Sequence, residues 1–422
     1  LLGVLGGLFA DDVDDVVDNP SAQAESFLQR FPAMTRPLLK ASYALQDALH
    51  GTSAVGFHAV NLGLHLAAVA LVLILARRAA ELAGVSASRT LWIATLTAGL
   101  WAVHPAAVDT VGQVAGRSAG LSTLLLLAAI WAATGPVARP GLALLAAALA
   151  PLARETALIA PLLLVAWQLC LPSSDRLRRA APVWIGAALA AGLIAALPRH
   201  RELIDFSLDQ RAPLDALRGN LFALSGMLRL WLQPWLIGAV PGQPLIHGWG
   251  DLPTLGRLLG LGGAGLLALA LRRRWPLAAL AVFWTLLALL PSNSVIWRVE
   301  PLAMRPLYLA GIGLALGLAV LLSRHMSTKV LALGLIGGLG GLTWHRATLL
   351  ADPVAFFADA AAHSPGDARP LILLGLSLAN AGDQSAAKAA LDRALRLDPG
   401  NPEAANALRL LQAVSVYSPA GG

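Results

Sequence analysis

Long apolar runs alternate with short polar connections along most of the chain. Such runs are typical of α-helices that cross a bilayer, where a helix can satisfy its own backbone hydrogen bonds. The predicted spans are Val55–Ala76, Thr90–Val103, Leu121–Thr134, Leu142–Leu152, Leu158–Leu171, Val183–Leu197, Leu255–Leu271, Pro276–Leu290, Arg305–Leu322 and Val330–Trp344. We interpret Leu1–Ala10 as the end of a truncated first helix. The pattern therefore predicts an all-α polytopic membrane protein with about eleven transmembrane helices.

Charged residues fall mainly in the connections between these runs. Only 13% of the residues are charged, 57% are hydrophobic, and the mean hydropathy is +0.67, values typical of membrane proteins. The net charge of +7 comes from short basic clusters, which favours the positive-inside pattern over a nucleic-acid surface. The predicted cytoplasmic clusters are Arg77-Arg78 with Arg89, Arg176–Arg179, Arg272–Arg274 and Arg324–Lys329. This assignment requires Leu221–Val240 to be interfacial or re-entrant.

The chain changes character after Trp344, where small and large apolar residues alternate with charges. The positions that a tetratricopeptide repeat needs are filled by Leu374-Gly375, Leu378, Ala387, Leu391, Ala394 and Pro399. The last three of these positions, Leu391, Ala394 and Pro399, have counterparts 34 residues earlier. The counterparts are Phe357, Ala360 and Pro365. We predict a transmembrane domain at 1–345, with an external first loop at 11–53, and a tetratricopeptide region at 352–414. Such a short array is expected to lean on the membrane domain or on a partner.

An acidic stretch follows the first apolar run. Five aspartates lie within the twelve residues Phe9–Pro20. Because a charge in lipid is costly, Asp11 and Asp12 are expected at the membrane surface. A carboxylate placed there can act as a general base on an incoming hydroxyl. A solvated acidic loop with a helix cap explains the same residues, and this alternative stays open.

Further polar residues are predicted near the outer ends of the spans. Together with the two aspartates, this set comprises Arg36, His104, Asp109, Arg117, Arg154, Glu155, Asn293, Arg298 and Arg305. Arginine suits an anionic head group, since its planar fork donates two hydrogen bonds at once. Each member also has a plainer interpretation. Arg36 could cap an interfacial helix, His104 could end one, and Arg117 and Glu155 could be loop charges.

Two histidines lie on one face of the second span. His58 and His65 could suggest a metal pair, but no third ligand of matching spacing follows, which favours interhelical hydrogen bonding. The one cysteine, Cys170, excludes a disulfide framework and a thiolate cluster. We therefore predict no metal site and no cofactor, although a dependence on a divalent metal stays open.

The ordered set of motifs resembles a known family. Its members in chain order are Asp11-Asp12 to Asn19-Pro20, Arg36-Pro37-Leu38, Gly56-Phe57-His58, His104-Pro105, Gly116-Arg117, Arg154-Glu155, Pro291-Ser292-Asn293 and Arg305 with Tyr308-Leu309. Together with a repeat tail, this order is similar to the TMTC-type transmembrane and tetratricopeptide glycosyltransferases of the GT-C superfamily. The resemblance covers nearly the whole chain.

The resemblance implies an activity and a site. It implies transfer of a sugar from a polyprenyl-phosphate carrier to a hydroxyl of a protein or glycan, with inversion. Asp11 and Asp12 would take the base position, Arg36, His104, Arg117, Arg154 and Arg305 the lipid-phosphate side, and Glu155 would orient an arginine. The expected setting is a bacterial inner membrane, with the first loop and the tail in the periplasm. The expected partners are membrane lipid, the lipid-linked sugar, and a protein held by the tail.

Two positions depart from the family pattern. Ser118 and Met304 stand where relatives often have a carboxylate. This departure favours an alternative, a non-catalytic membrane scaffold or accessory subunit whose tail docks a partner protein in a larger complex. A transporter is disfavoured, because no charge pair falls in mid-span and no inverted repeat is present.

Overall fold

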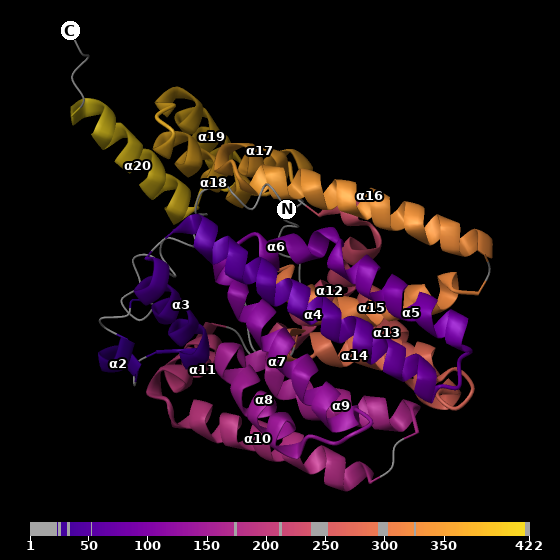
Figure 1. Cartoon of the computed structure of the whole chain (residues 1–422). Helices are drawn as coiled ribbons and strands as arrows, with labels where there is room; N and C mark the ends of the chain where they lie inside the picture. The colour runs from indigo at the N-terminus through magenta and orange to yellow at the C-terminus, as the bar shows by residue number, and fades with distance from the viewer. Residues whose placement is uncertain are drawn as a thin grey trace.

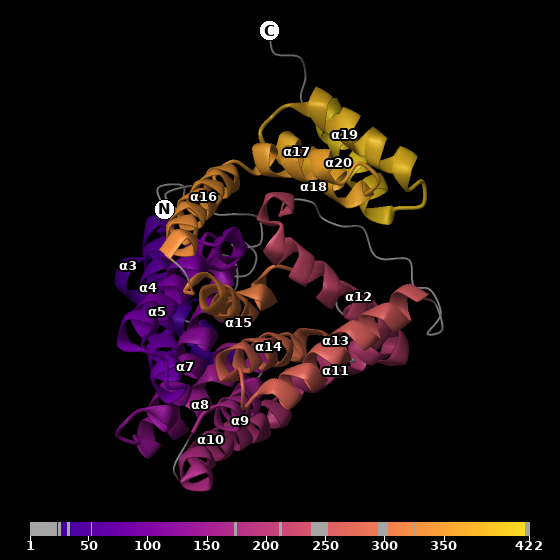
Figure 2. The ribbon, with the colours of Figure 1, turned by 90° about the vertical axis from the view of Figure 1, so that its right-hand side faces the viewer.

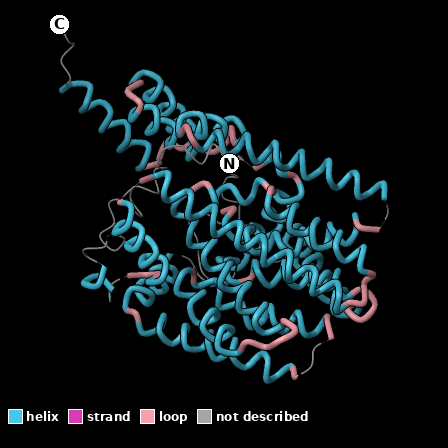
Figure 3. Tube along the Cα trace, viewed as in Figure 1, coloured by secondary structure: helices cyan, strands magenta, loops and turns pink. Residues whose placement is uncertain are grey.

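The computed structural model describes residues 23, 27–31, 34–51, 53–172, 175–210, 213–237, 252–293, 303–324 and 326–417. These residues form helices joined by loops, without a strand (Figure 3). The first half comprises α2 (Phe27–Arg30), α3 (Pro37–His50), α4 (Ala54–Leu82), α5 (Ala87–Ala102), η5 (Pro105–Ala107), α6 (Val108–Val111), η6 (Val114–Gly116), α7 (Arg117–Thr134), α8 (Pro140–Ala153), η7 (Glu155–Ile159), α9 (Ala160–Cys170) and α10 (Arg176–Ala196).

The second half continues with α11 (Pro198–Gln210), α12 (Pro213–Leu232), η8 (Pro234–Leu236), α13 (Leu252–Leu271), α14 (Pro276–Leu289), η9 (Pro291–Asn293), α15 (Arg305–Leu322) and α16 (Met326–Leu350). Four helices close the described chain, namely α17 (Pro353–His363), α18 (Ala368–Asn380), α19 (Gln384–Leu397) and α20 (Pro402–Tyr417). Figures 1 and 2 show that α17–α20 gather at one end of the molecule, with α16 leading to them.

Several helices are long and apolar enough to cross a membrane. Among the described residues there are five, or six if the bent pair of α5 with η5 and α6 is one span. The five are Ala54–Leu82, Val114–Thr134, Arg176–Ala196, Leu252–Leu271 and Arg305–Leu322. These helices indicate a membrane protein. The predicted number of about eleven also counts the short apolar helices α8, α9 and α14, helix α16, and the first segment, which lies outside the described residues, so it stays a prediction.

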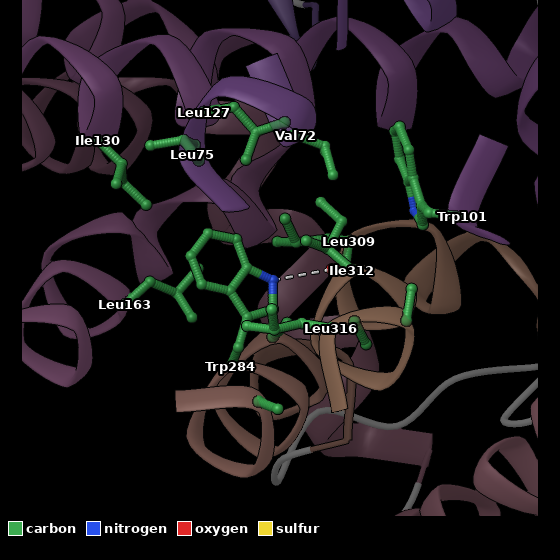
Figure 4. Packing of buried hydrophobic residues seen from close by; sticks show 14 of the residues in the cluster. Val72, Leu75, Trp101, Leu127, Ile130, Leu163, Trp284, Leu309, Ile312 and Leu316 are labelled. Atoms are coloured by element: carbon green, nitrogen blue, oxygen red, sulfur yellow. Dashed lines mark hydrogen bonds between the residues drawn. The ribbon is translucent and has the colours of Figure 1, made fainter. Parts of the chain in front are cut away.

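The core of the bundle is built from small residues and a few large rings. Gly313 lets α15 approach α14 closely, since a Cβ there would lie 2.5 Å from the Thr285 hydroxyl oxygen. The indole N–H of Trp284 donates to the carbonyl of Leu309 at 3.0 Å, inside an apolar cluster (Figure 4). Trp101 donates likewise to the carbonyl of Tyr308 at 2.7 Å. These bonds satisfy the N–H groups of two indoles that are buried in the bundle.

The C-terminal helices pack on the bundle through a small apolar contact. Val108 of α6 lies in one buried cluster with Ala347 and Leu350 of α16 and Phe357 of α17. Helix α17 therefore contacts both α6 of the bundle and the end of α16. Helices α18 and α19 meet at Gly375 and Leu391, two of the positions predicted for a tetratricopeptide repeat.

Gly375→Ala is expected to destabilise the tail by about 1–2 kcal/mol, because overpacking a filled interface outweighs the gain in helix propensity. A Cβ at Gly375 would lie 2.7 Å from the Cγ atom of Leu391, which is 1% exposed. Hydrogen exchange of the α18 and α19 peptides would measure the loss. Gly400→Ala is the control, since a Cβ there meets no atom within 4 Å. Equal protection in both variants would contradict this packing.

Candidate functional site

A polar pocket opens between α7, η7, α14 with η9, and α15. It is lined by Ala119, Ser122, Thr123, Leu126, Arg154, Thr156, Ala157, Ala288, Ser292, Arg305, Pro306 and Leu309. Two guanidinium groups and four hydroxyl-bearing side chains thus share one pocket. Such groups donate to an anion, and together they give the pocket a positive charge. The pocket lies at the ends of helices whose opposite ends carry the basic clusters.

Arg154 comes to the pocket from the end of α8. Pro151 lies in the last turn of α8, and Arg154 is the extended residue that ends the helix. Its side chain is 9% exposed, and Nη1 donates to the hydroxyl oxygen of Ser118 at 3.1 Å. Ser118 is uncharged and thus contacts this arginine without cancelling its charge.

Arg305 comes to the pocket from the start of α15. The helix begins at Arg305 with Pro306 in its first turn, where a missing N–H costs nothing. The guanidinium Nη2 donates to the side-chain oxygen of Gln113 at 2.8 Å. The backbone carbonyl of Gln113 accepts from the amide of Asn61 at 2.8 Å, so this glutamine is fixed to α4. Arg154 and Arg305 are far apart in the chain, and the fold brings them together.

A second charged cluster lies beside Arg154 in the sequence. The Nε of Arg36 donates to both oxygens of Glu155 at 3.1 Å, and His200 Nε2 lies 3.3 Å from the Oε1 of Glu155. Glu155 is in the connection between α8 and α9, outside the five candidate spans. Burial alone would raise the pKa of this carboxyl, but the Arg36 guanidinium and the hydrogen bond from His200 outweigh it and lower the pKa to about 2. Glu155 therefore orients Arg36.

The backbone at Arg36 is strained. It has φ 54° and ψ 58°, in the left-handed region that non-glycine residues rarely adopt. Its side chain is 38% exposed, and its terminal nitrogens Nη1 and Nη2 make no hydrogen bond with the described residues. The left-handed backbone and the salt bridge to Glu155 together place the Arg36 guanidinium at the surface of the bundle.

Arg117 lies outside the pocket, although it was predicted on the phosphate side. Its side chain is 1% exposed, and the guanidinium lies over the rings of Tyr43 and Phe57 at 4.6 and 5.3 Å. It donates to four oxygens of α3 and α4, those of Asn61 Oδ1, Gln46 Oε1, Ser42 O and Phe57 O. A guanidinium enclosed in this way has no room for a phosphate. We correct that prediction and assign Arg117 to holding α3 against α4 and α7.

His104 is also engaged by the protein. Its ring stacks on Trp231 at 4.5 Å, Nε2 donates to the Trp231 carbonyl at 3.0 Å, and Nδ1 accepts from the backbone N–H of Ala106 at 3.1 Å. Both ring nitrogens are used, so the alternative that His104 terminates a helix describes its place better than phosphate binding. His65 behaves similarly, with Tyr308 at 2.8 Å and the Ala102 carbonyl at 3.1 Å, which confirms interhelical hydrogen bonding.

The remaining predicted residues divide into two groups. Asp11, Asp12 and Arg298 lie outside the described residues. Asp109 accepts from Arg346, and Asn293 is buried in η9, which follows α14. Within the part of the chain that the structure describes, no group of three or more His, Cys, Asp and Glu side chains could hold a metal ion.

Sequence reasoning missed the neutral partners of the arginines. Gln113 was missed because an uncharged residue in a polar loop gives no signal of its contacts. Ser122 and Thr123 belong to a predicted span, where hydroxyls are common for backbone hydrogen bonding. His200 follows Pro198-Arg199 in a stretch with no motif. Only the spatial arrangement identifies them.

Fold and pocket together define a helical protein with membrane-spanning segments and an arginine-lined pocket at one end of its bundle. No protein-family description matches the chain, no curated protein is similar to it, and no solved structure matches its fold.

Proposed function

We propose that this chain is a membrane glycosyltransferase of the GT-C type, similar to the TMTC proteins, that transfers a sugar from a polyprenyl phosphate to a hydroxyl acceptor. The observation that carries the proposal is the pocket in which Arg154 and Arg305 lie among four hydroxyl-bearing side chains. A phosphodiester head group is the ligand for which two buried or half-buried guanidinium groups are best suited.

The reaction assigns a role to each group. Asp11 or Asp12 removes the proton of the acceptor hydroxyl, whose oxygen attacks C1 of the sugar. The bond from C1 to the phosphate oxygen breaks, and the lipid phosphate leaves with the electron pair. The leaving group gains one negative charge, so Arg154 and Arg305 stabilise the transition state more than the ground state. The attack from the opposite side inverts the configuration at C1.

Arg36 supplies a further cation at the same end of the bundle. Glu155 accepts from the Nε of Arg36. The terminal nitrogens of Arg36 make no hydrogen bond with the described residues, so they can donate to a ligand. Glu155 immediately follows Arg154, so both arginines are positioned from one short turn. In the proposed enzyme, Arg36 contacts the anionic substrate at the outer rim, while Arg154 and Arg305 contact it deeper in the pocket.

The distribution of charge supports an external pocket. The basic clusters stand at the ends of α4, α5, α10, α13 and α15 that are remote from the pocket, which the positive-inside rule assigns to the cytoplasm. The pocket and the tail then face the periplasm of a bacterial inner membrane. We further propose that α17–α20 are tetratricopeptide repeats that hold the acceptor protein or another partner.

A non-catalytic scaffold is the second candidate. It is favoured by Arg117 and His104, two predicted ligands that the protein uses for its own packing. In that case the arginine pocket would bind a membrane phospholipid, and the tail would dock a partner.

Binding of a short-chain prenyl phosphate to the purified protein tests the pocket. Arg154→Gln and Arg305→Gln are each expected to weaken binding about tenfold or more, because each removes a charged hydrogen-bond donor. Arg139→Gln is the matched control, since it removes the same charge between α7 and α8 at the other end of the bundle. Equal affinity in all three variants would refute the phosphate site.

A further inference from the structure

One loop contacts both the arginine pocket and the C-terminal helices. It runs from Val108 to Gln113 and includes α6. At its end, the side-chain oxygen of Gln113 accepts from Arg305 Nη2 at 2.8 Å. An amide oxygen fixes the guanidinium without neutralising it, so Arg305 keeps its full charge for an anion.

The beginning of the same loop is tied to α16. The Asp109 carboxylate accepts from Arg346 Nη2 at 3.1 Å. Arg346 is 8% exposed, and its Nη1 donates to the carbonyl of Ile237 at 2.9 Å. Removing one partner of a mostly buried ion pair strongly destabilises the protein, because the other charge is left unpaired. Arg346 therefore anchors the loop to the helix that carries the tail.

Apolar packing reinforces this anchor. Val108 shares a buried cluster with Leu350 and Phe357, the last residue of α16 and a residue of α17. A Cβ at Gly112 would lie 3.1 Å from a methyl carbon of Leu350, so the loop and α16 are in tight contact. The loop has little room to move unless the tail moves with it.

We infer that Gln113 is a positioning residue for Arg305. The contact of α16 and α17 with the loop sets the position of Gln113. The chain of contacts runs from Phe357 and Arg346 through Val108 and Asp109 to Gln113, and from there to Arg305. The C-terminal helices thus support the arginine pocket, and a partner that shifts the tail changes the affinity of the pocket. The inference rests on the proposed function, because it takes Arg305 as a phosphate ligand.

Affinity measurements with a short-chain prenyl phosphate test the inference. Gln113→Leu is expected to weaken binding about tenfold, and Asp109→Asn several-fold, because each frees Arg305 to leave the pocket. Asp359→Asn makes the same change on α17, away from the loop, and is expected to have no effect. Gln113→Glu keeps an acceptor for Arg305 and is expected to preserve the fold. The negative charge of the new carboxylate is expected to weaken anion binding.

A double-mutant cycle separates positioning from general damage. If Asp109 acts through Arg305, Asp109→Asn has no further effect on binding in the Arg305→Gln background. Fully additive losses would overturn the inference while leaving the pocket intact. If Arg305→Gln and Arg154→Gln bind normally, the proposed function fails instead. A readout without ligand completes the test, since Phe357→Ala is expected to speed hydrogen exchange at residues 108–113, and unchanged exchange would contradict the contact.

Discussion

Replacing Arg117 with leucine is expected to remove most of the folded protein from the membrane. The change removes a donor from four oxygens, the side-chain oxygens of Asn61 and Gln46 and the backbone carbonyls of Ser42 and Phe57, in a site that is 1% exposed. An unsatisfied buried polar group costs about 1–3 kcal/mol, and the side-chain oxygens of Asn61 and Gln46 both lose the guanidinium. Their combined cost is a large fraction of the stability of many domains.

Thermal unfolding and yield after detergent extraction measure this effect. Arg117→Lys keeps the charge but loses the fork, and it is expected to fall between the native protein and Arg117→Leu. Arg139→Leu is the control, because Arg139 is exposed at the start of α8 and only lies over the ring of Trp131. If Arg117→Leu folds normally and loses only phosphate binding, then Arg117 binds the phosphate, as the family resemblance implies.

The helical organisation follows from the sequence because apolar runs and proline punctuation are local signals. The predicted apolar segment Arg305–Leu322 coincides with α15. The span Val55–Ala76 is longer in the structure and continues to Leu82 past two arginines. Hydropathy stops at a charge, whereas a helix continues as long as its backbone bonds and side-chain stems allow.

The number of spans could not be settled from hydropathy for a related reason. Helices α8, α9 and α14 are apolar but short, and α5 bends by 56° into the segment that follows it. Whether a short or bent helix crosses the bilayer depends on its tilt and its neighbours. A window of sequence carries neither kind of information.

The site could be predicted only in part. Arg154 and Arg305 share a pocket, as expected of arginines at the outer ends of spans. Arg117 comes from the same kind of position, but its guanidinium faces α3 and α4 and donates to Gln46 and Asn61. The direction of a side chain depends on long-range packing, so residue type and spacing could not separate these cases.

The double change Asp11→Asn, Asp12→Asn is expected to lower sugar transfer by roughly 10²–10⁴-fold, the usual contribution of a general base. Asparagine keeps the size of the side chain and its hydrogen bonding but cannot take the proton of the acceptor. Binding of a prenyl phosphate should stay unchanged, since the arginines of the pocket are intact. The variant thus separates chemistry from binding, which Arg154→Gln and Arg305→Gln do not.

Glycan mass spectrometry of periplasmic and surface proteins gives the readout, at equal membrane levels of each variant. The matched control is Asp14→Asn, Asp15→Asn, which removes the same charge from the same stretch. Loss of a hexose-sized mass from specific peptides in the first variant alone supports the transferase and identifies its acceptor. Loss in both variants assigns the effect to the charge of the stretch. An unchanged glycan pattern, together with normal prenyl phosphate binding, favours the scaffold, because the pocket then binds a lipid without transferring from it.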